Sequence, residues 1–182
     1  MPVFTEQVDN GLRFAVPYAL MAVLFILNIT FLSFPLSYGL EPPLILMMIY
    51  YWSIYRPTLV PVWLVFTVGL LFDFISALPI GLHGFIYIAV RWLVTDQRLL
   101  LASQSFFAVW TGFVVVSLLS VVLEWTLFGL INMHWPPFAP SLSIFLSGVF
   151  LFPFVSITLH LTHKLLPAFT DQYGMTIKKT IR

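Results

Sequence analysis

Two carboxylates, Asp73 and Glu124, lie within long uncharged stretches of this chain. The reason for an acid at each of these positions is the first question that the sequence raises. Asp73 lies within GLLFDFISALPIGLHG, residues 69–84, and Glu124 separates the apolar runs Leu99–Leu123 and Trp125–His163. An ionised side chain in the middle of a bilayer costs roughly 2.5–3.5 kcal/mol, so it is expected to face protein or water and to have a partner. The two acids therefore predict packing inside a helix bundle, an interface with a partner helix, or ion or proton transport.

Each acid is expected to belong to a stripe of small and polar residues on one face of a helix. Helical spacing gives two such stripes, which are Gly69, Asp73 and Ser76, and Ser117, Ser120 and Glu124. Stripes of this kind suit close helix packing. The two stripes either meet inside the bundle, with one carboxyl protonated because two carboxylates in apolar surroundings would not both ionise, or face a neighbouring helix.

A turn is expected after Asp73. Pro79 and Gly81 interrupt the apolar sequence, and proline often opens a new helix. His83 begins the next segment, close enough in sequence to cap or pair with Asp73.

The last apolar segment combines small residues with a proline. Its first half carries little side-chain bulk, at Ser141, Ser143, Ser147 and Gly148, and Pro153 is expected to kink the helix. The pattern predicts a groove-forming helix whose small residues contact either this chain or a partner.

No catalytic, metal or cofactor site is predicted. The chain has no cysteine, and a zinc site needs three or four ligands, whereas His134, His160 and His163 are expected at membrane edges, the last two opposite His83. Intramembrane serine hydrolysis needs a serine in a tight small-residue turn, and Gly81–Gly84 puts a histidine there. A paired acidic motif for metal-assisted head-group transfer is also missing.

The composition is that of an integral membrane protein. Of 182 residues, 60% are hydrophobic and 8% charged, and mean hydropathy is +1.01, so a water-soluble globule would have too little polar surface. A net charge of +1 argues against a nucleic-acid partner. The basic residues Lys178, Lys179 and Arg182 near the end are either solvated or lie against anionic lipid headgroups.

The pattern of prolines and polar residues divides one all-α membrane domain, 1–182, into six expected transmembrane helices. They are expected at about 14–34, 42–55, 57–78, 80–95, 104–131 and 139–163. The second and fourth are short, and 57–95 either crosses the membrane twice or forms a re-entrant hairpin.

Lysine and arginine predict the orientation. With six spans, all eight basic residues fall on one side of the membrane. Because short loops rich in these residues stay in the cytoplasm, both termini are expected there.

Several motifs together are similar to those of one family. Residues 69–76, GLLFDFIS, followed by Pro79-Ile80-Gly81, resemble the signature of the rod shape-determining protein MreD family. Glu41-Pro42-Pro43 before a short span that ends at Arg56-Pro57, and the last span from Pro140 to Pro153, resemble it too. The resemblance covers about 14–163.

The resemblance implies a non-enzymatic, multi-pass scaffold of the bacterial inner membrane, active in cell elongation and peptidoglycan synthesis. It implies association with the bitopic protein MreC and, through it, with MreB filaments, RodA and a class B penicillin-binding protein. The implied fold is that of the substrate-binding subunits of energy-coupling-factor vitamin transporters. The family motif falls on Gly69, Asp73, Ser76 and Gly81, with no catalytic role, and Ala77-Leu78 stands where many relatives carry glycine and a small polar residue, which predicts a stiffer turn.

Two other functions stay open on the sequence. A small-ligand-binding subunit of a vitamin-type transporter would need convergent polar groups, and the loops offer Ser37, Asn132 and His134. A proton-coupled carrier would use Asp73 and Glu124. A homodimer is compatible with each function.

Overall fold

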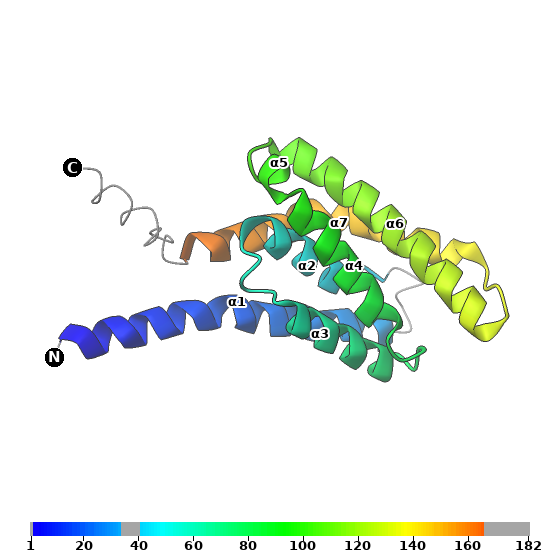
Figure 1. The fold of residues 1–182 in the computed structure, drawn as a ribbon, viewed down its shortest axis with the longest axis horizontal. Coiled ribbons are helices and arrows are strands. Elements are labelled where there is room, and N and C mark those ends of the chain that lie inside the picture. The colour runs from blue at the N-terminus through cyan, green and yellow to red at the C-terminus, as the bar shows by residue number, and fades with distance from the viewer. Residues whose placement is uncertain (1, 34–40, 166–182) are drawn as a thin grey trace.

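The protein is a bundle of helices (Figure 1). The computed structural model describes residues 2–33 and 41–165, and in these ranges all regular secondary structure is helical. The elements are α1 (Pro2–Ser33), α2 (Leu44–Tyr55), α3 (Val62–Ile75), α4 (Leu82–Asp96), α5 (Arg98–Ala102), α6 (Phe106–Asn132) and α7 (Phe138–Leu165).

Each of the six expected segments is helical, but several bounds differ. α1 begins at Pro2 instead of about residue 14, and its first part extends beyond the other helices (Figure 1). Hydropathy marks where a chain enters the apolar phase, and a helix can continue into the polar phase beyond that point. α3 begins only after Pro61, which has extended backbone angles and cannot donate a hydrogen bond. The five-residue helix α5 was not expected.

α2 is the centre of the bundle. Every residue from Leu44 to Ile54 is buried, and the helix contacts α1, α4, α5, α6 and α7. Its sequence, LILMMIYYWSIY, is apolar around the whole circumference, which is typical of a helix that is surrounded on all sides. α3, in contrast, packs chiefly against α4 at the edge.

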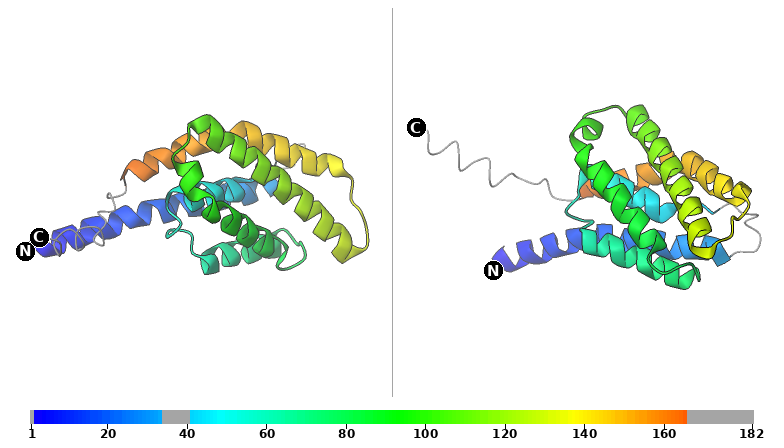
Figure 2. Two further views of the ribbon diagram at one scale, coloured as in Figure 1. Left: turned by 45° about the horizontal axis from the view of Figure 1, so that its top comes forward. Right: turned by 45° about the vertical axis from the view of Figure 1, so that its right-hand side comes forward.

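The helices differ in their ability to cross a bilayer. α6 and α7 are long and apolar enough, and they run side by side as a hairpin (Figure 2). Among the described residues, Val16–Phe31 of α1, α2 and α3 are apolar but shorter. At 1.5 Å per residue α2 is about 18 Å long, less than the hydrocarbon core of about 30 Å.

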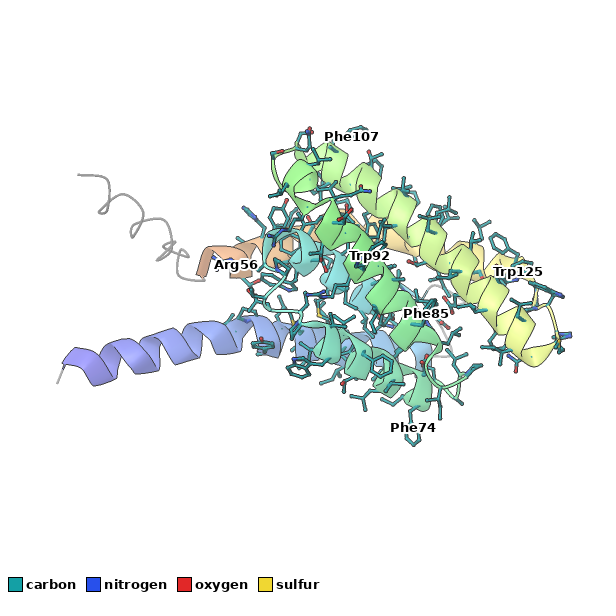
Figure 3. All side chains as sticks on the ribbon, viewed as in Figure 1. Arg56, Phe74, Phe85, Trp92, Phe107 and Trp125 are labelled. Carbon is teal, nitrogen blue, oxygen red and sulfur yellow. The ribbon has the colours of Figure 1, made fainter. Side chains whose placement is uncertain are left out.

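Three arginines lie at the same end of the bundle. Arg56 follows α2 at one end of the bundle, and Trp125 of α6 lies toward the opposite end of the bundle (Figure 3). At the Arg56 end, the Nε of Arg91 in α4 donates a hydrogen bond to the Val60 carbonyl, which fastens the α2–α3 connection to α4. Arg98 begins α5 at the same end.

Candidate functional site

The turn between α3 and α4 reverses the chain within residues 76–81. Ser76 caps α3, and Ala77 then adopts a left-handed conformation with φ 53°. The Leu78 amide donates to the Asp73 carbonyl over 3.0 Å, the bond that closes a Schellman motif. Gly81 follows with φ 95°, which glycine adopts without strain, and it is the N-cap of α4.

The Asp73 carboxylate caps α4 from the neighbouring helix. It accepts hydrogen bonds from the amide of Gly81 over 2.9 Å and from the amide of His83 over 3.1 Å. The N-cap Gly81 has no side chain of its own, so these amides would otherwise lack acceptors. A helix N-terminus also favours negative charge, which explains how Asp73 can be 0% exposed.

His83 connects Asp73 to Glu124. Its Nδ1 lies 2.7 Å from Asp73 Oδ1, and because a carboxylate only accepts, Nδ1 carries the hydrogen. Its Nε2 lies 3.6 Å from Glu124 Oε1 on α6. The rings of Phe72 and Tyr87 pack against the imidazole at centroid distances of 4.8 and 5.4 Å. One cluster therefore joins α3, α4 and α6.

A contact between two glycines brings α3 and α4 together at this point. A Cβ on Gly69 would lie 2.5 Å from the Cα and N of Gly84 and 2.8 Å from the carbonyl carbon of His83. The two backbones touch, so the absence of a side chain at Gly69 positions the Asp73 carboxylate over the amides of α4.

A polar pocket of about 90 Å³ opens beside His83. Its polar lining comes from Glu41, Ser76, His83, Tyr87, Ser120 and Glu124. The Ser76 Oγ is buried, and no described residue forms a hydrogen bond with it. Burial, and then repulsion from Glu124, raise the pKa of Glu41 above its ordinary value. The pocket thus brings together acidic groups from two distant parts of the chain, Glu41 before α2 and Glu124 on α6.

The small residues of α7 lie elsewhere in the bundle. Ser147 and Gly148 are buried, and a Cβ on Gly148 would lie 3.0 Å from the Pro43 ring and 3.6 Å from Ser117 Oγ. α7 continues through Pro153 as one helix. These residues form a contact of α7 with α6 and the start of α2, apart from the Asp73 cluster.

The sequence did not predict a structural role for two polar residues, the buried Asn28 and the half-buried Glu41. Asn28 of α1 accepts a hydrogen bond from the Ile45 amide over 3.1 Å, so it caps α2 as Asp73 caps α4. The signal was present, because Asn28 is an amide inside an apolar segment. Glu41 was considered only as part of a proline motif.

The residues suggested for a small-ligand site do not converge. Asn132 and His134 are exposed at the α6–α7 turn and do not line the polar pocket, and Ser37 lies outside the described residues. Among the residues searched, no group of three or more histidine or acidic side chains could hold a metal ion. The cluster offers hydrogen bonding and charge pairing between helices.

The helical fold, the apolar surface and the buried cluster define a multi-helix membrane protein. The chain matches the family described as rod shape-determining protein MreD over residues 9–164, and it belongs to that family. The family is non-enzymatic, acts in determining rod shape and is associated with the cell-elongation machinery. No curated protein and no solved structure matches the chain.

Proposed function

We propose that this protein is a membrane scaffold of the bacterial elongation complex that acts by contact with other membrane helices. The observation that supports this is the buried state of the Asp73 carboxylate. Its acceptor capacity is used by two backbone amides and the His83 ring, so the acid fixes α3 against α4, and His83 extends the cluster to Glu124 on α6. Such a cluster holds its helices in fixed positions for contact with other helices, and this role involves no catalysed reaction.

MreC is the first partner in this proposal, and MreB, RodA and a class B penicillin-binding protein are reached through it. The protein crosses the membrane six times, with both termini in the cytoplasm. The common location of Arg56, Arg91 and Arg98 at one end of the bundle supports this orientation.

Asp73→Leu tests the proposal in cells. We expect the variant to insert but to recover several-fold less MreC from native membranes and to alter cell shape, because α4 loses its cap and His83 its partner. Asp96→Leu is the matched control, since Asp96 is an exposed acid at the opposite end of α4. Normal rods with undiminished MreC recovery in Asp73→Leu would contradict the proposal.

A cavity of about 350 Å³ between α1, α2 and α3 favours a small-ligand binder as the second candidate. Its lining is almost wholly apolar, with Tyr18 as the polar exception, whereas vitamin-type ligands need several placed polar groups. Mass spectrometry of the purified protein distinguishes the candidates, because a stoichiometric retained vitamin-like molecule would favour the second one. A proton-coupled carrier predicts pH-driven uptake into vesicles.

A further inference from the structure

The polar pocket is lined by more acidic than basic groups. Glu41 and Glu124 contribute two carboxyl groups to the lining, and His83, which already pairs with Asp73, is the single lining group that can become a cation. Burying these carboxyl groups as anions is costly unless a cation pairs with them, so a cation that enters the pocket would let them ionise and would pair with them.

Among the residues that the structure describes, no lysine or arginine lies at this end. Arg56, Arg91 and Arg98 lie at the opposite end of the described bundle. Residues 34–40, the sequence FPLSYGL between α1 and α2, contain no basic residue. A compensating cation would therefore come from outside the described part of the bundle.

A second observation is independent of the charges. The Ser76 Oγ lines the same pocket and is buried without any hydrogen-bond partner among the described residues. A buried hydroxyl without a partner costs free energy, and a donor entering the pocket would satisfy it. The remaining walls are apolar and include Phe72, Ile86 and Val121. A charged tip on an apolar stem suits this lining.

We propose that this pocket binds the ammonium or guanidinium group of a lysine or arginine that lies next to the membrane helix of a partner protein. The inference rests on the proposed scaffold function and names the contact through which it acts. The apolar stem lies against the walls, the cationic tip meets Glu41 and Glu124, and Ser76 accepts one of its hydrogen bonds.

A protein side chain fits this pocket better than a lipid amine does. An ethanolamine headgroup carries a phosphate close to its ammonium group, and Glu41 and Glu124 would repel that phosphate.

The first test is partner recovery by the full-length protein from native membranes. We expect Glu41→Gln combined with Glu124→Gln to lower recovery of the MreC-type partner about tenfold or more, and Asp96→Asn to leave it unchanged. Glutamine substitution of each lysine and arginine next to the partner's membrane helix should reproduce the loss at one position. Undiminished recovery by the double variant would overturn the pocket inference and leave the scaffold function standing, whereas no recovery by the wild type would overturn both.

Chemical labelling tests the same contact without a substitution in this protein. A carbodiimide with glycine ethyl ester modifies accessible carboxyl groups, and peptide mass spectrometry reports the modified fraction of Glu41 and Glu124. We expect the partner to reduce this fraction several-fold relative to Asp96, and its glutamine variant to restore it. Equal labelling with and without the partner, or protection by phosphatidylethanolamine nanodiscs alone, would overturn the inference.

Discussion

The α3–α4 and α6–α7 pairs are both antiparallel helix hairpins, but different chemistry holds each pair together. In α3–α4 the backbones touch at Gly69 and Gly84, and the buried Asp73 carboxylate bonds across the turn. In α6–α7 large rings fill the interface, where Phe113 and Phe152 stack at 4.2 Å.

The polar links of the two hairpins differ in the same way. The Trp110 indole N–H donates to the Val149 carbonyl over 3.1 Å, a neutral bond between half-buried groups, whereas Asp73 accepts several bonds while fully buried. The α3–α4 hairpin thus depends on glycines without side chains and on a charged residue, whereas the α6–α7 hairpin depends on large aromatic side chains. A membrane protein with little water-driven association between helices can use either method.

The largest expected effect comes from adding one methyl group to the glycine contact. Gly69→Ala should lower stability by about 3 kcal/mol, because its Cβ would overlap the backbone of α4. The melting temperature in detergent, followed by circular dichroism, should fall by roughly 6–12 °C. Gly148→Ala is the matched variant in α7, and we expect about 1 kcal/mol because its main neighbour is the edge of the Pro43 ring. Equal losses would show that the two interfaces do not differ as described.

Breaking the polar link of each hairpin should have a smaller and unequal effect. Asp73→Leu removes the cap of α4 and leaves the Nδ1 of His83 without its acceptor, at about 2 kcal/mol. Trp110→Phe removes one neutral bond, at about 0.6 kcal/mol. Chemical unfolding in mixed micelles measures both, and a larger loss for Trp110→Phe would reverse the comparison.

The smallest effect concerns the turns. Ala77 and Met133 both adopt left-handed backbone conformations, with φ of 53° and 51°, and both are exposed. Ala77→Gly and Met133→Gly should each raise stability by about 0.5 kcal/mol, since relief of strain is partly offset by the greater freedom of the unfolded chain. Thermal melting of both variants checks this. A loss for Ala77→Gly alone would indicate that the stiff turn supports the Asp73 cluster.

Hydropathy and proline positions predicted which parts of the chain are helical. They did not predict that α2 is central and that α6 and α7 lie on the outside, because all three sequences are apolar around their circumference. In a bilayer both protein and lipid are apolar surroundings, so the hydrophobic pattern does not distinguish them. α1 begins at Pro2, before the expected span at about 14–34, because hydropathy reports where a chain is apolar and not where a helix begins.

Part of the site could also be predicted. Asp73 and His83 are joined by a short turn, so local sequence indicated that they could meet. Glu41 and Glu124 approach the same pocket from distant parts of the chain, and Asn28 meets Ile45 across the α1–α2 connection. Contacts between residues of different helices depend on how the helices pack. The spacing of residues within one segment does not predict that packing.

The caps that α2 and α4 receive from their preceding helices have a consequence for biosynthesis. Alone in hydrocarbon, the Ile45 amide of α2 and the Gly81 and His83 amides at the start of α4 would have no acceptor, and lipid cannot supply one. Asn28 is already present when α2 emerges from the ribosome, and Asp73 when α4 does. We therefore expect α1 with α2, and α3 with α4, to leave the insertion channel as pairs, so that the chain releases these two short helices into lipid only after their hydrogen-bond acceptors have arrived.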